Sequence, residues 1–152
     1  MTNALMSARD AFLTRHPETR ITLQGRDWGL IDTGGDREAL LFLPGTLGRA
    51  DVFFRQIEAL APHRRVLAVS YPASGGVVEW AQSLGVLLDR LGIARVAVLG
   101  SSLGGYLAQY FAATQPARVS HLFAANTLDG VCLLYTYPSP RDRTRSRMPS
   151  SA

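Results

Sequence analysis

One serine stands in a pattern that is typical of an enzymatic nucleophile. Residues 100–104 read GSSLG, which fits G-x-S-x-G with Ser102 at its centre. The apolar run RVAVL precedes the pattern, and the apolar segment YLAQYFAA follows shortly after it. A strand that passes through a tight, glycine-flanked turn into a helix forms a nucleophile elbow, which exposes a reactive hydroxyl. Ser102 is therefore a candidate nucleophile, and a glycine turn that fits the pattern by chance is the alternative.

The residues around Ser102 are the types that such a turn needs. Gly100 and Gly104 allow the strand and the following helix to pass close together, because glycine has no side chain. The backbone N–H of Leu103 would open the helix and point at the negative charge that develops on an attacked carbonyl oxygen. A serine hydroxyl is a weak nucleophile until a neighbouring base takes its proton. The chain must therefore be searched for an oxyanion partner, a histidine and an acid.

The second oxyanion donor is predicted in the loop after an earlier strand. The apolar run ALLFL at 39–43 ends in PGTLG at 44–48. In folds with a nucleophile elbow, this loop supplies one backbone N–H to the oxyanion hole. Gly45 permits the turn, and Thr46 is the residue placed to donate its N–H. An ordinary strand-end turn is the alternative interpretation.

Strands and helices alternate along the chain. We expect strands over 21–25, 28–32, 39–43, 65–72, 95–100 and 119–126, from apolar runs bounded by turn residues. Apolar residues at helical spacing predict helices over 51–60, 77–91 and 103–113, and a short amphipathic helix near the N-terminus. Repeated strand–helix–strand units with short links give an α/β fold with a mostly parallel sheet.

Four segments carry a resemblance to a known family. They are LFLPGTLGRADVFFRQIEAL, the strand with SYP, VLGSSLGGYLAQYFA and VSHLFAANTLDG. Together they resemble α/β-hydrolases, and ADVFFRQ most resembles their maspardin-like branch. The resemblance covers roughly residues 10–130. It implies that Ser102 is the nucleophile and that Leu103 and Thr46 supply the oxyanion-hole amides. Pro44 departs from the histidine that many of these enzymes carry at that position, which changes the hydrogen bonding beneath the loop.

The acid and the base are harder to find. The order in this fold is Ser, then Asp or Glu, then His. Asp129 follows the last expected strand and is a candidate acid, although Asp-Gly is also a common turn pair. His121 is the only histidine after Ser102, and it falls within an expected strand, while His16 and His63 precede the serine. We expect the catalytic histidine to lie in sequence beyond residue 130.

The composition changes after residue 130. Residues 141–147 alternate arginine with polar residues and have no period that would build a packed element. We therefore expect residues 1–130 to be the N-terminal part of an α/β-hydrolase domain, and 131–152 to be a disordered basic tail. The tail resembles a translated sequencing adapter, so we interpret it as foreign to the domain. A basic recognition tail is the alternative.

Length and charge exclude several classes of function. The 152 residues suit one domain, and 47% of them are hydrophobic. The net charge of +4 lies mostly in residues 139–152, whose four arginines and one aspartate sum to +3, so a nucleic-acid partner is not expected. Because the sequence has no apolar run of 18 residues, no secretory signal and a single cysteine, we expect a cytoplasmic protein.

Two functions follow from these residues. The first is a serine hydrolase of a small ester or related acyl substrate, which needs neither cofactor nor metal. This chain by itself would turn over negligibly without a histidine. The second is a non-catalytic binding or adaptor protein on a hydrolase scaffold, with a protein partner, because a fold does not determine a function.

Overall fold

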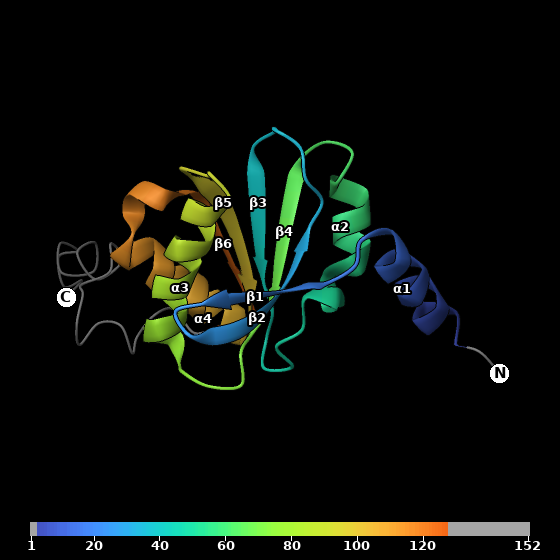
Figure 1. Ribbon diagram of the computed structural model, residues 1–152, viewed down its shortest axis with the longest axis horizontal. Coiled ribbons are helices and arrows are strands. Elements are labelled where there is room, and N and C mark those ends of the chain that lie inside the picture. The colour runs from blue at the N-terminus through green and yellow to red at the C-terminus, as the bar shows by residue number, and fades with distance from the viewer. Residues whose placement is uncertain (1–2, 128–152) are drawn as a thin grey trace, which may run out of the picture.

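A six-stranded sheet forms the centre of the molecule. The computed structural model describes residues 3–127. The strands lie in the order β1-β2-β4-β3-β5-β6 (Figure 1). At one side β1 and β2 form an antiparallel hairpin, and β2 pairs antiparallel with β4, whereas β4, β3, β5 and β6 are mutually parallel. The strand bounds are β1 Thr19–Leu23, β2 Arg26–Asp32, β3 Ala39–Leu43, β4 Arg65–Ser70, β5 Val96–Ser101 and β6 Val119–Ala125.

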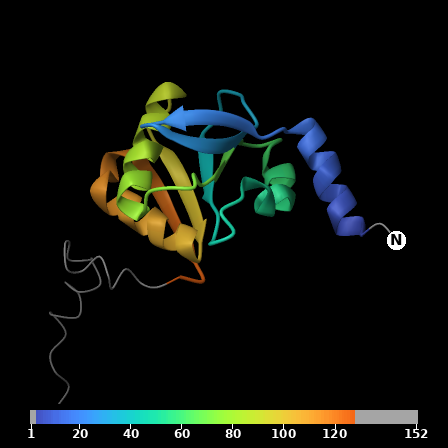
Figure 2. The ribbon, with the colours of Figure 1, turned by 60° about the horizontal axis from the view of Figure 1, so that its bottom comes forward.

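Helices cover the sheet on both faces. On one face α3 (Val77–Arg90) and α4 (Leu103–Thr114) bury a core that includes Leu84, Leu107 and Phe111. On the other face α1 (Ala4–Arg15) and α2 (Phe54–Leu60) bury a second core that includes Phe12 and Ile57. Figure 2 shows the two helix pairs on opposite sides of the sheet. Two short 3-10 turns complete the described elements, η1 (Ala50–Phe53) and η2 (Pro116–Arg118).

The predicted α/β fold with a mostly parallel sheet is confirmed, and most differences are at element ends. The strand predicted over 65–72 ends at Ser70, because the Tyr71 N–H donates to the Gly48 carbonyl oxygen at 2.9 Å instead of continuing the sheet. Pro72 then has no N–H to donate. The helix predicted over 51–60 begins as the 3-10 turn η1. The N-terminal helix is present, but Phe12 is its only fully buried residue.

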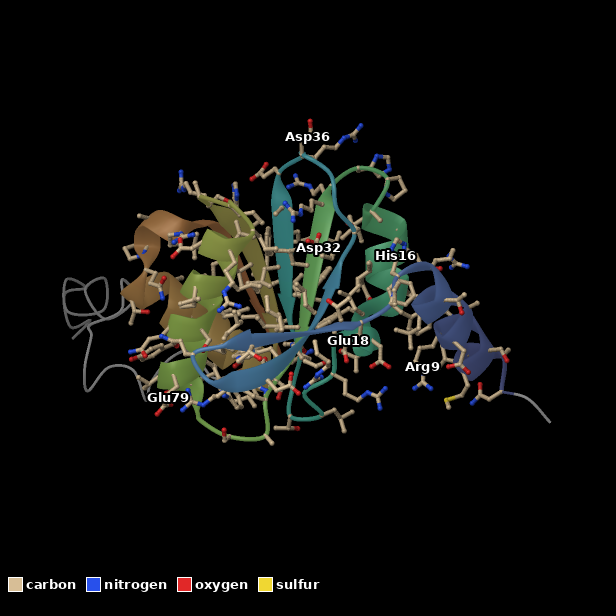
Figure 3. The ribbon with its side chains drawn as sticks, viewed as in Figure 1. Arg9, His16, Glu18, Asp32, Asp36 and Glu79 are labelled. Atoms are coloured by element: carbon tan, nitrogen blue, oxygen red, sulfur yellow. The ribbon has the colours of Figure 1, made fainter. Side chains whose placement is uncertain are left out.

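The parallel strands bring their C-terminal ends to one edge of the sheet. The loops after β3 and β4 both leave the sheet at the bottom of Figure 1, whereas Asp36, before β3, lies at the opposite edge in Figure 3. In open α/β sheets, ligands bind outside the carboxyl ends of the strands. The sheet therefore places Thr46, Ser102 and the end of β6 at the edge where a site is expected.

The strand β6 is exposed along most of its length. Within residues 3–127 no strand pairs with its outer edge, and five of its seven residues are exposed. Its large apolar side chains Leu122 and Phe123 are 41% and 53% exposed. An exposed apolar edge strand is a template for self-association.

We predict that this 152-residue chain self-associates through β6. Substitution Phe123→Glu places a charge on the exposed strand and should shift the chain toward monomer in sedimentation velocity. The matched control is Leu5→Glu on α1, where the leucine is 50% exposed, and it should leave the distribution of species unchanged. Monomeric wild-type chain at high concentration, or an equal effect of both substitutions, would contradict the prediction.

Candidate active site

Ser102 occupies a backbone conformation that L-residues rarely adopt. Its φ is 54° and its ψ is −119°, between the last residue of β5 and the first residue of α4. A conformation of this kind costs on the order of 1–3 kcal/mol and persists only where the surrounding structure enforces it. The predicted strand–turn–helix geometry around Ser102 is thus confirmed, and the strain marks the turn as a candidate functional position.

Two glycines make the turn sterically possible. A Cβ at Gly100 would lie 2.0 Å from the Gly104 carbonyl oxygen, and a Cβ at Gly104 would lie 2.0 Å from the Leu43 carbonyl oxygen. Both contacts are with backbone atoms, which cannot move aside as a flexible side chain can. The spacing that the sequence showed around Ser102 therefore has a direct cause in the contact between β5, α4 and the end of β3.

Backbone hydrogen bonds hold Ser102 on both sides. Its N–H donates to the Ala125 carbonyl oxygen of β6 at 2.9 Å. Its own carbonyl oxygen accepts from the Gly105 and Tyr106 N–H groups at 3.0 and 3.1 Å. The residue is exposed, and its hydroxyl has no hydrogen-bond partner among the described residues. The backbone is thus fixed while the side chain is presented to solvent.

The loop after β3 lies against the serine. A Cβ added at Gly45 would lie 3.5 Å from the Ser102 Cβ and 4.0 Å from its Oγ. The Gly45 carbonyl oxygen accepts from the Gly48 N–H at 2.9 Å, which closes a tight turn. In a trans peptide the C=O and the following N–H point in opposite directions, so this bond also sets the direction of the Thr46 N–H.

The predicted site residues share one pocket. A depression of about 560 Å³ is lined by Thr46, Ser102, Leu103, Tyr106, Asn126 and Thr127. Thr46 lies in the loop after β3 and Leu103 is the first residue of α4, yet both line the same depression as Ser102. The Leu103 N–H begins α4, where helix geometry leaves the first amides without intrahelical acceptors and with partial positive charge. The pocket therefore places the serine beside the two residues, Thr46 and Leu103, that the sequence predicts to supply the oxyanion-hole amides.

Sequence reasoning missed three residues of this pocket. Tyr106 lies four residues after Ser102 on α4, so helical spacing would have placed it near the serine. Asn126 and Thr127 directly follow β6, and Asn126 has a positive φ of 50°. Residues that follow neighbouring parallel strands meet at the same edge, which was the available signal. Thr127 also packs closely on α4, since a Cβ at Gly105 would lie 2.6 Å from its Cγ2.

None of the three histidines in the chain lies near Ser102. His121 pairs with Ala97, and Ala125 pairs with Ser101, so His121 lies four residues back along β6 from the elbow, about 13 Å away at about 3.3 Å per residue. His63 is exposed in the loop before β4, at the opposite edge of the sheet. The centroid of the His16 ring lies 5.3 Å from the centroid of the Phe12 ring, and His16 lies beside α1 and α2 (Figure 3). The candidate acid Asp129 lies outside the described residues.

Among residues 3–127 no three His, Cys, Asp or Glu side chains form a group that could hold a metal ion. No helix in that range is long and apolar enough to cross a membrane.

The fold and this site define the class of the protein. The sequence profile of the alpha/beta hydrolase fold matches residues 38–144, and the chain belongs to that family. The match extends beyond the domain boundary that we predict at residue 130. Naproxen esterase from Bacillus subtilis has a similar fold, with a TM-score of 0.66 over 80% of this chain and 48% of its own, at 24% identity.

The predicted maspardin-like branch is also confirmed. The chain is 43% identical to maspardin from Homo sapiens over 105 residues, which cover 66% of this chain and 34% of maspardin. It is 38% identical over 106 residues to a 2-hydroxy-6-oxononadienedioate/2-hydroxy-6-oxononatrienedioate hydrolase from Burkholderia vietnamiensis, covering 60% of this chain and 36% of that enzyme. The chain thus spans about a third of the length of the curated relatives it matches.

Because the backbone segments are in close contact at the elbow, we predict that a single methyl group added there strongly lowers the stability of the fold. Gly104→Ala should lower the free energy of unfolding in urea by about 3 kcal/mol, because overpacking forces backbone atoms apart. Gly76→Ala is the matched control, since its added Cβ would meet only the Glu79 carboxylate at 3.6 Å and its φ is −144°. Equal stabilities for the two variants would contradict the packing described for the elbow.

Proposed function

We propose that the protein is a serine hydrolase that acts on a small ester or a related acyl compound. One observation carries the proposal: Ser102 sits in a strained turn, with its hydroxyl in a pocket beside the backbone of Thr46 and Leu103. Strained backbone is concentrated at functional sites, and nothing in the packing of the sheet alone requires a serine there. The pocket volume of about 560 Å³ suits a small substrate.

The proposed reaction proceeds in two steps. The Ser102 Oγ attacks the carbonyl carbon while its proton passes to a histidine, and the carbonyl oxygen becomes an oxyanion that accepts from the Leu103 and Thr46 N–H groups. Collapse of this intermediate expels the alcohol, which takes the proton from the histidine. A water molecule then attacks the acyl-serine, gives a proton to the histidine, and releases the acid as Ser102 regains its proton.

The proposal needs a histidine from elsewhere in the full-length protein. The three histidines of this chain lie away from the pocket. The curated relatives are longer than the matched region, which leaves room for the base and the acid in sequence that corresponds to the rest of their length. We propose that this additional sequence completes the triad, with Asp129 as a further candidate for the acid.

A second candidate function is binding without catalysis. The observation that favours it is the absence of any of the three histidines near Ser102. In that case the pocket and the exposed strand β6 would serve a protein partner, and the serine hydroxyl would stay unreactive. The two functions differ in one measurable property, which is the nucleophilicity of Ser102.

A fluorophosphonate probe measures that property. Because the probe reacts with activated serines, the full-length wild-type protein should be labelled, and Ser102→Ala should lose all labelling. The matched control is Ser101→Ala, which removes the neighbouring hydroxyl of the same GSSLG segment and should keep the wild-type rate. Labelling that survives Ser102→Ala would defeat the assignment of the nucleophile. An unlabelled wild-type protein would favour the binding function.

The 152-residue chain provides a separate test of the missing base. Since no histidine of this chain reaches Ser102, we expect it to hydrolyse p-nitrophenyl acetate no faster than its own Ser102→Ala variant. Removal of triad residues leaves only the contribution of the oxyanion hole and binding, about 10³–10⁴-fold over water in a complete enzyme. A burst of p-nitrophenol that requires Ser102 would show that this chain contains a base.

A further inference from the structure

Tyr71 holds the oxyanion loop at both of its ends. It is the first residue after β4 and lies outside the lining of the Ser102 pocket. Its hydroxyl donates to the Pro44 carbonyl oxygen at 2.6 Å, at the start of the loop. Its backbone N–H donates to the Gly48 carbonyl oxygen at 2.9 Å, at the end of the loop. A single residue thus bonds to both sides of the turn that carries Thr46.

The ring of Tyr71 is itself fixed by two tryptophans. Trp80 of α3 stacks on it with ring centroids 4.6 Å apart and an interplanar angle of 15°. Trp28 of β2, which is fully buried, meets it edge-on at 6.1 Å. Aromatic pairs in these arrangements are favourable beyond their buried area. The Tyr71 ring is therefore held in an aromatic cluster, which fixes the position of its hydroxyl.

The loop is shaped to lie close to that ring. Gly48 has a φ of +66°, and a Cβ at this position would lie 3.4 Å from the Tyr71 ring. A residue with a side chain would therefore be strained there and would also press on the ring. Burial raises the pKa of the Tyr71 hydroxyl well above its ordinary value, so the group keeps its proton and remains a donor.

We propose that Tyr71 is a positioning residue for the oxyanion hole. It clamps residues 44–48 so that the Thr46 N–H is held toward the carbonyl oxygen bound at Ser102. The inference rests on the proposed serine hydrolase function, which it deepens. The Tyr71 hydroxyl supplies a hydrogen bond to this loop at Pro44, two residues before Thr46.

Tyr71→Phe removes the hydroxyl and keeps the aromatic ring. In the full-length protein, the maximal rate of fluorophosphonate labelling should fall about tenfold, the order of effect that the loss of one hydrogen bond supports. The probe concentration for half-maximal rate should stay unchanged, because the oxyanion forms only as the probe reacts. The matched control is Tyr110→Phe on α4, a half-buried tyrosine outside the pocket, which should label like wild type.

Amide hydrogen exchange tests the clamp without any reaction. In Tyr71→Phe the Gly48 and Tyr71 amides should exchange at least several-fold faster than in wild type, while amides in β3 and β5 keep their rates. Unchanged labelling, unchanged exchange at these two amides, or an equal loss in Tyr110→Phe would overturn the positioning role. If wild type is not labelled at Ser102, the proposed function fails, and the exchange data alone decide whether Tyr71 holds the loop.

Discussion

Three segments of backbone meet where β5 turns into α4, and no side chain fits between them. Gly100 lies against the carbonyl group of Gly104, and Gly104 lies against the carbonyl group of Leu43. A Cβ at either glycine would clash with that backbone. This contact brings the N-terminus of α4 onto the ends of β3 and β5. The strained turn at Ser102, the direction of the Leu103 N–H and the approach of the 44–48 loop all depend on it.

The site is assembled from the ends of parallel strands that are neighbours in the sheet. The strand order places β3 between β4 and β5, so the loop after β3 lies beside both Ser102 and Tyr71. The Ser102 N–H bonds to Ala125, which ties the elbow to β6 as well. The Tyr71–Trp80 stack connects the loop to α3 on one face of the sheet. Each group around the pocket thus has support from a regular element.

Much of this arrangement could be predicted from local sequence. The apolar run of β3, the G-x-S-x-G spacing and the helical period of α4 together predicted the positions of Ser102, Leu103 and Thr46, because each pattern reflects a backbone requirement. Asn126 and Tyr71 were not predicted. Their roles arise from the lateral order of the strands and from a hydrogen bond across 27 residues of sequence, which no local pattern encodes.

The position of His121 also could not be predicted from local sequence. His121 is the only histidine after Ser102 in the sequence, but the register of β6 with β5 places it four residues away from the elbow, well back along the strand. Its side chain lines a separate depression with Leu40 and Phe123. Sequence order alone could not assign this position, because register is set by the pairing of the two strands.

The central claim is that the Ser102 hydroxyl and the Thr46 and Leu103 amides form one reaction site. A crystal structure of the full-length protein after reaction with a phosphonate inhibitor tests it most directly. We expect the phosphorus to be bonded to the Ser102 Oγ, with a phosphonyl oxygen about 2.7–3.1 Å from both backbone nitrogens. An adduct on another residue, or an oxygen directed away from both amides, would contradict the claim.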